Sequence, residues 1–313
     1  MKGYVLQRVL GMLAVMFVVV TIVFIIVRIA PGDPAAVMLG PDATAGDVAA
    51  LRARLGLDRS IPVQYGIFFG QLVRGDLGDS IFLNRPVLTA LAERAEPTFF
   101  LTVFSILIAA AIALPVGILS AYWRGSLFDQ AATTLAMLAA SVPSFWLGLL
   151  LIQFFAVRLG FFPVSGYGGP GAGLGVRLSH LVLPALSLGI VSSALILRFT
   201  RASMLDVLSD DYVRTARSKG MSEFRVIMRH AFKNALIPVL TVIGLTAALL
   251  VSGAVVTETV FGLPGIGSLV VSAVLRRDYP VIQGALLVIA ALYVLINFLI
   301  DMLYLAIDPR VRY

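Results

Sequence analysis

The chain has 313 residues, of which 59% are hydrophobic and 13% charged, and its formal net charge is +7. Soluble domains carry about 25% charged residues, so this composition indicates a membrane protein. The absence of cysteine excludes disulfide scaffolds, thiolate zinc sites, iron–sulfur clusters and cysteine nucleophiles. None of the three lysines is followed by Ser or Thr, so the chain carries no P-loop for ATP.

Six segments of at least 19 residues contain no charged side chain, namely 9–27, 97–123, 130–157, 178–197, 234–257 and 279–300. An α-helix rises about 1.5 Å per residue, so about 20 apolar residues cross the roughly 30 Å hydrocarbon core of a bilayer. Each segment is therefore predicted to be a transmembrane helix of an all-α polytopic protein. Prolines inside these segments, such as Pro143, predict local kinks.

The first segment also has some features of a cleaved signal peptide. Lys2 and Arg8 precede it, as the basic residues of a signal peptide would. The apolar part of a signal peptide is about 7–15 residues long, which is shorter than segment 9–27. Residues 1–30 are therefore predicted to form a retained N-terminal transmembrane helix.

A long and more polar region, residues 31–93, separates the first two predicted spans. Thr44 or Asp47 can begin a short helix here, because both residue types favour helix starts. Val48, Leu51 and Leu55 would share one face of that helix, and Gly56 would end it. We expect a small amphipathic cap that packs on the spans.

The distribution of basic residues predicts the orientation of the chain. Thirteen Lys and Arg residues lie on the side of the N-terminus, whereas the two short loops of the opposite side hold four. Short loops rich in Lys and Arg stay in the cytoplasm. Both termini are therefore predicted to be cytoplasmic and region 31–93 external. Membrane topology explains the positive charge better than nucleic-acid binding does.

The cytoplasmic loop 199–234 is predicted to contain two short helices. Ser209 or Asp210 can cap the first helix, which Gly220 would end because glycine readily adopts a left-handed conformation. Ser222 can cap the second helix, which would run through Arg229. Such local order in a basic loop is typical of a docking surface, and the alternative is a solvated loop that only fixes topology.

Two further uncharged stretches are predicted not to span the membrane. Residues 159–176 are rich in glycine and form an external loop. Residues 259–275 contain the sequence GLPGIG at 262–267, which leaves only eight continuous residues after it. That remainder is too short to cross a bilayer, although a segment that dips partway into the membrane is compatible with it.

The loop sequence resembles the EAA-type coupling loop of ATP-binding-cassette (ABC) importer permeases. That family carries Glu-Ala-Ala, three residues, Gly and a downstream Ile-x-Leu-Pro. Here the triplet is Arg-Thr-Ala at 214–216, the glycine is Gly220, and the end reads NALIP at 234–238. The missing glutamate departs from the general pattern. The version YVRTARxKG followed by HAxxNALIP is similar to the dipeptide/oligopeptide (nickel) branch of binding-protein-dependent type I importers.

Other segments resemble the same branch, in the same order, over nearly the whole chain. They are RIAPGDP at 28–34, LGLD at 55–58, GDLGDS at 75–80, TETVFGLPGIG at 257–267 and RDYP at 277–280. Each segment alone is weak evidence, but together they identify the chain as resembling a transmembrane permease subunit of this family.

The resemblance implies an architecture and a set of partners. Residues 94–305 would form a five-helix permease core that includes coupling loop 199–234, and residues 306–313 a cytoplasmic tail. The chain would lie in the bacterial inner membrane and form half of a translocation pathway. Its implied partners are a second homologous permease, two cytoplasmic ABC ATPases and an external substrate-binding protein. The chain itself would be no enzyme and bind no cofactor, since ATP and Mg would bind to the ATPases.

Two groups of residues are functional candidates, and neither is expected to be catalytic or to bind metal: the resemblance implies the first, and the position of Glu258 beside GLPGIG at the outer end of the fifth predicted span suggests the second. The residues that would couple to an ATPase are Tyr212, Val213, Arg214, Thr215, Ala216, Arg217, Lys219, Gly220 and Met221. Candidates for an external gate or a ligand-side contact are Glu258, Gly262, Pro264, Gly265 and Gly267.

Three other classes of membrane protein are alternatives to an importer permease. A secondary transporter would need inverted repeats and ionisable residues at the membrane midplane, and an intramembrane enzyme would need a nucleophile–base pair or a metal cluster. Neither set of features is visible in the sequence. A scaffold or receptor would use the ordered loop for signalling. The transported ligand stays open among dipeptides, longer peptides, glutathione, metal chelates and sugars.

Overall fold

A computed structural model describes residues 2–29, 34–40, 43–54, 56–80, 82–169 and 171–307. These residues form two compact units, each built from segments that are distant in sequence. Unit 1 comprises Pro97–Pro264 and Leu295–Tyr313, and unit 2 comprises Lys2–Glu96 and Gly265–Val294. Most of the predicted tail, as well as Leu55, lies outside the described residues.

Unit 2 contains four N-terminal helices, a short hairpin, one whole later helix and part of two others. The N-terminal elements are α1 (Lys2–Ile29), α2 (Pro34–Leu39), α3 (Ala45–Arg54), α4 (Ile61–Val73), and the antiparallel strands β1 (Asp79–Ser80) and β2 (Arg85–Pro86). The later elements are the start of α5 (Val87–Tyr122), α12 (Ile266–Arg276) and the first part of α13 (Tyr279–Ile307).

The short helix predicted within residues 31–93 is present as α3. Thr44 Oγ1 accepts a hydrogen bond from the Asp47 amide at 3.2 Å, and the Asp47 carboxylate accepts one from the Thr44 amide at 3.2 Å. This reciprocal cap satisfies two backbone groups, and the hydrogen bonds from Thr44 lower the pKa of Asp47. The helix ends at Arg54, shortly before Gly56 takes a left-handed φ of 65°.

Helix α4 has no counterpart among the predicted elements. It packs on α1, where the rings of Tyr65 and Phe24 meet edge to face at 5.1 Å and Thr21 Oγ1 lies 2.8 Å from Tyr65 Oη. These contacts connect the region after the first span to the span itself.

Two sequence motifs that lie far apart in the chain meet in unit 2. Asp278 immediately precedes α13, and its carboxylate accepts hydrogen bonds from Ser80 Oγ at 2.5 Å and from the Phe82 amide at 3.4 Å. Asp278 and Ser80 are both buried. The GDLGDS and RDYP segments therefore contact each other and connect the hairpin to the start of α13.

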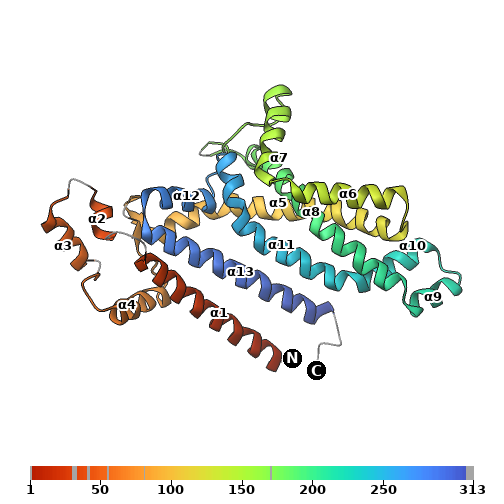
Figure 1. Ribbon diagram of the computed structural model, residues 1–313, viewed down its shortest axis with the longest axis horizontal. Coiled ribbons are helices and arrows are strands. Elements are labelled where there is room, and N and C mark those ends of the chain that lie inside the picture. The colour runs from red at the N-terminus through yellow and green to blue at the C-terminus, as the bar shows by residue number, and fades with distance from the viewer. Residues whose placement is uncertain are drawn as a thin grey trace. The chain divides into compact units, whose positions relative to one another are not determined.

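Unit 1 is built around two long helices, α8 (Leu174–Leu208) and α11 (Phe232–Val260), which lie side by side (Figure 1). The other elements of unit 1 are the rest of α5, α6 (Leu127–Ser141), α7 (Ser144–Leu151), the π-helical turn η1 (Ile152–Arg158), α9 (Asp211–Ser218), α10 (Glu223–Arg225), the π-helical turn η2 (Val226–Ala231) and the end of α13. Gly117 lets α5 approach α8 closely, because a Cβ there would lie 2.8 Å from the Thr200 Cβ.

Five of the six predicted spans are continuous apolar helices of the described chain, and the third is not. Its place is taken by α6 and the α7–η1 segment, which are bent by 97° relative to each other. Pro143 lies at the break, and Val142 before it is extended with φ −89° and ψ 127°. A proline disfavours helical backbone in the preceding residue, which ends α6 and turns a predicted kink into a sharp bend.

An ion pair fixes the start of α6 to α8 within unit 1. The Arg201 guanidinium contacts Asp129 through two hydrogen bonds, at 2.6 Å from Nε to Oδ1 and 2.8 Å from Nη2 to Oδ2. The Asp129 side chain is 5% exposed and also accepts a hydrogen bond from the Gly125 amide at 2.9 Å. A bidentate pair of this kind stabilises the contact between the two helices and also fixes the relative orientation of the two side chains.

The substitution Asp129→Asn is expected to destabilise unit 1 by about 2 kcal/mol, because it leaves the Arg201 charge without its partner. The measurement is the thermal unfolding midpoint of the detergent-purified chain. Asp206→Asn is the matched control, since Asp206 is an exposed acid on the same helix as Arg201. Equal midpoints for the two variants would show that the ion pair contributes nothing.

Candidate functional site

The segment between α8 and α11 forms a helix, a glycine elbow and a second helix, as predicted. Asp210 is extended and precedes α9, although its side chain makes no capping hydrogen bond. Asp211 lies in the first turn and Arg217 in the last, where the helix dipole favours these charges. The chain then turns at Gly220, whose φ is 75°.

One face of α9 is anchored in the protein. Val213 is fully buried and Ala216 is 6% exposed, and both pack with Val226 of η2. Leu208 and Met221 complete this small cluster at the two ends of α9. Within the predicted coupling set, Val213, Ala216 and Met221 therefore hold the helix in position.

Two polar contacts connect α9 to the helix that follows the elbow. Arg217 Nε lies 2.8 Å from Glu223 Oε1, so an ion pair bridges Gly220. The Tyr212 hydroxyl accepts a hydrogen bond from Asn234 Nδ2 at 2.7 Å and donates one to the His230 carbonyl oxygen at 3.4 Å. These contacts restrict the angle between α9 and α11.

The second helix of the loop does not end at Arg229. The helical backbone runs without a break from Glu223 through η2 and α11 to Val260. No non-helical residue therefore lies between Glu223 and the apolar part of α11, and only the elbow at 219–222 separates α9 from this helix.

The opposite face of α9 is exposed and mostly basic. The Arg214 side chain is 76% exposed, and its ion-pair partner among the described residues is Asp211 of the same helix, at 3.4 Å. The exposed members of the predicted coupling set are Tyr212, Arg214, Thr215, Arg217, Lys219 and Gly220. This surface can dock on an acidic partner, and the described residues nearby contain no nucleophile–base pair.

The predicted external gate residues of unit 1 lie at the end of α11. Glu258 is fully buried, and its Oε1 accepts a hydrogen bond from Thr98 Oγ1 at 2.5 Å. Gly262 is exposed with a φ of 61°, and the preceding Phe261 carbonyl oxygen accepts a hydrogen bond from the Gly166 amide at 2.9 Å. Pro264 is half-buried after this turn. In this conformation the Glu258 carboxylate does not reach solvent.

The remaining gate candidates belong to unit 2. Gly265 precedes α12 in an extended conformation, and Gly267 lies in its first turn. Both glycines are buried. These two glycines form the start of α12. Contact of any of the five gate candidates with a ligand or a partner protein stays a prediction.

The contacts of Glu223 and Asn234 with α9 were not apparent from the sequence. Both residues lie within the loop, but only folding brings them to Arg217 and Tyr212. The signal that could have found them is the spacing of Arg217 and Glu223 across a glycine, which allows an ion pair around a tight turn.

Comparison with known proteins shows which family has this architecture. Residues 113–313 match the family described as "Binding-protein-dependent transport system inner membrane component", and residues 1–101 match the N-terminal region of such components. A probable peptide ABC transporter permease protein (y4tP) of Sinorhizobium fredii is 46% identical over the full length of both chains. The glutathione transport system permease protein GsiC of Pectobacterium atrosepticum is 44% identical, also over the full length of both.

A solved structure shares the fold at low sequence identity. The inward-facing MetNI methionine ABC transporter contains a chain that is 19% identical to this one, with a TM-score of 0.59. The match covers 70% of this chain and 96% of that chain.

Proposed function

Because the chain belongs to the family of binding-protein-dependent transport system inner membrane components, we propose that it forms half of a translocation pathway for peptides or a related small solute. The fold class predicted from the sequence is confirmed: the chain is an all-α, multi-pass membrane protein with the fold of type I importer permeases. The printed names of the full-length relatives support a peptide or glutathione as the cargo.

The chain couples transport to ATP through α9, which docks on a cytoplasmic ATPase. The observation that carries this proposal is the combination on α9 of an exposed basic face with an inner face, Val213 and Ala216, that is anchored on the helix leading into a span. When the ATPases close on ATP, they pull α9, and the Arg217–Glu223 and Tyr212–Asn234 contacts pass this movement to α11.

The complete importer contains a second homologous permease, two ATPases that bind ATP and Mg, and an external substrate-binding protein. The chain itself supplies no catalytic group. Both termini and loop 199–234 face the cytoplasm, and region 31–93 faces outward, as the excess of Lys and Arg on one side supports. Glu258 and the turn at 262–267 contribute to the external gate, and Glu258 becomes accessible when the outer side opens.

The test is peptide uptake into proteoliposomes that contain the chain with its partner subunits. We expect uptake of a labelled dipeptide only when hydrolysable ATP and the binding protein are both present. Uptake that an ion gradient drives without ATP would contradict the proposal and identify a secondary transporter.

The substitution Tyr212→Phe is expected to lower ATP-driven uptake about fivefold, because it removes a hydrogen bond worth about 1 kcal/mol between α9 and α11. The comparison is Tyr122→Phe, since the Tyr122 side chain is also 39% exposed like that of Tyr212. Tyr122 makes no side-chain hydrogen bond among the described residues. An equal effect of both substitutions would remove Tyr212 from the coupling mechanism.

A further inference from the structure

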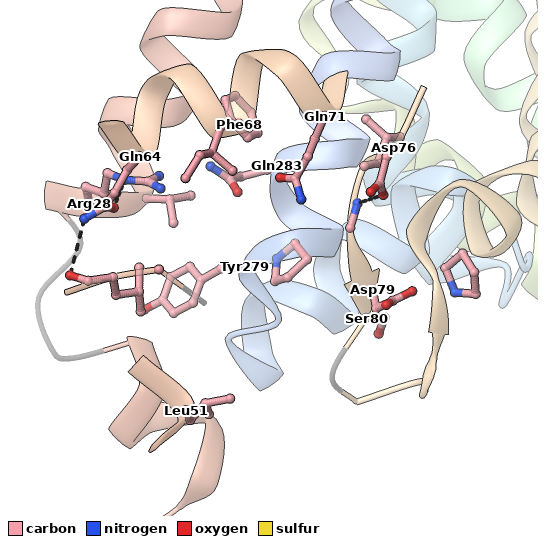
Figure 2. A pocket seen from close by; sticks show the side chains of 18 of the residues that line it. Arg28, Leu51, Gln64, Phe68, Gln71, Asp76, Asp79, Ser80, Tyr279 and Gln283 are labelled. Carbon is pink, nitrogen blue, oxygen red and sulfur yellow. Dashed lines mark hydrogen bonds between the residues drawn. The ribbon is translucent and has the colours of Figure 1, made fainter. Parts of the chain in front are cut away.

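Unit 2 contains a cavity of about 930 Å³ that the coupling mechanism does not use (Figure 2). Residues of α1, α3, the turn before α4, α4 itself, the hairpin and the start of α13 line it. Its volume lies near the upper end of the range of about 300–1,000 Å³ in which proteins hold small ligands. The cavity belongs to the part of the chain that contains the external region 31–93.

One side of the cavity carries a fixed positive charge. The Arg28 guanidinium lies 3.5 Å from the centre of the Phe24 ring and donates hydrogen bonds to Gln64 Oε1 at 3.0 Å and to the Phe24 carbonyl oxygen at 3.2 Å. Gln64 in turn donates to the Arg59 carbonyl oxygen at 2.8 Å, and Arg59 also lines the cavity. A guanidinium held in this way is well placed to bind a carboxylate.

The opposite side carries two carboxylates, together with the Arg85 guanidinium, whose charge is paired with Glu93 at 2.7 Å. Figure 2 shows Asp76 and Asp79 across the cavity from Arg28 and Gln64. Asp76 Oδ1 accepts a hydrogen bond from the Gly78 amide at 2.8 Å, which fixes its orientation. Asp79 is exposed, and its side chain has no hydrogen-bond partner among the described residues. Both carboxylates can attract an ammonium group.

Between the two charged sides lie amides and apolar side chains. Tyr279, Phe68 and Leu77 supply apolar surface. The Gln283 Nε2 atom is buried and has no hydrogen-bond partner among the described residues. A buried donor left unpaired is unfavourable, so an acceptor supplied by a ligand would be stabilised here.

We propose that this cavity binds a short peptide with free termini. The peptide carboxylate lies toward Arg28 and Arg59, its ammonium group lies toward Asp79 and Asp76, and a peptide carbonyl oxygen accepts a hydrogen bond from Gln283. A ligand with one charge would leave the opposite side of the cavity unneutralised, whereas a zwitterion neutralises both. This proposal rests on the proposed function, because it makes the cavity a site at which peptide is held before it enters the pathway.

The test is binding of trialanine to the full chain in lipid nanodiscs, without the binding protein. We expect measurable binding and a loss of about tenfold in affinity when the peptide is N-acetylated, because a hydrogen bond between charged groups is removed. Asp79→Asn is expected to weaken trialanine binding to a similar extent. Acetylation should then have little further effect, since the ammonium group and Asp79 belong to one contact.

Matched controls keep the test specific. Asp58→Asn removes an exposed carboxylate of the same unit that does not line the cavity, and it should leave trialanine binding unchanged. On the basic side of the cavity, amidation of the peptide's C-terminus should weaken trialanine binding less in Arg59→Gln than in the unchanged chain. Arg74→Gln is the control, because Arg74 is exposed but does not line the cavity, and it should leave the effect of amidation unchanged.

Two results would overturn the proposal: no trialanine binding, or an effect of acetylation that stays the same in Asp79→Asn. Asp79-dependent binding of the external binding protein, without trialanine binding, would also overturn it by assigning the cavity to a protein contact. If ATP-driven uptake persists in these cases, only the cavity proposal fails. Trialanine binding in a chain that shows no ATP-driven uptake would instead contradict the proposed function.

Discussion

Replacing Gly220 with valine is expected to abolish ATP-driven uptake while the chain stays in the membrane. The elbow residue has a φ of 75°, a conformation that raises the energy of an L residue by about 1–2 kcal/mol and that of a β-branched residue by more. No atom lies within 4 Å of a Cβ placed there, so the effect comes from the backbone and not from a clash. To relieve this strain, the backbone at residue 220 would leave the left-handed conformation. The angle between α9 and Glu223 would then change, and the Arg217–Glu223 ion pair that transmits movement would break.

The control for this experiment is Gly220→Asn. Asparagine tolerates the left-handed conformation far better than valine and adds a side chain of similar size at the same place. We therefore expect the asparagine variant to retain most of the uptake. Membrane fractionation checks insertion of both variants. Unchanged uptake in Gly220→Val would exclude the elbow from coupling.

Deletion of residues 210–221 is expected to abolish association with the ATPases. It removes α9 and the elbow, which carry the exposed basic surface. The two long helices that flank this segment, α8 and α11, keep their own packing in unit 1. Co-purification of the ATPases with the chain measures the effect, and an unchanged yield of ATPase would show that the docking surface lies elsewhere.

A crosslinking experiment tests the same surface without removing any part of the fold. The chain contains no cysteine, so a single introduced thiol is unique. Arg214→Cys places it on the exposed face of α9 and should give a disulfide or bismaleimide crosslink to a cysteine introduced on the docking surface of the ATPase. Val213→Cys places it on the buried face and should not. Equal crosslinking at both positions would contradict the assigned orientation of α9.

The sequence predicted which segments form long apolar helices better than it predicted where these helices end. Uncharged runs identify spans because charged side chains are costly in a bilayer. Helical backbone, however, continues wherever its hydrogen bonds can be made, as α8 does from segment 178–197 to Leu208. The same reason explains why the helix from Glu223 joins α11 without a break.

The bend at Pro143 shows a second limit. Proline disfavours helical backbone at the preceding residue, but whether a helix bends slightly or breaks depends on what packs around it. The α6 and α7 segments each pack against α8, and they meet at 97°. Residues 130–157 alone contain no signal for that angle.

The coupling segment was predictable where local chemistry decides its structure. In the sequence, α9 is bounded by Asp210 before it and Gly220 after it. Ser222 marks the start of the next helix. The contacts that hold it, such as Tyr212 with Asn234, join residues 22 positions apart and depend on the packing of α9 against η2. Cavity residues in unit 2 are farther apart still, so the cavity could not be predicted from spacing.

Purification of the chain from native membranes in mild detergent, with mass spectrometry of the proteins that accompany it, tests the central claim most directly. The proposed importer predicts a second permease and P-loop ATPases in amounts comparable to this chain. Recovery of the chain alone or only with copies of itself, together with solute uptake that persists without ATP, would contradict the claim.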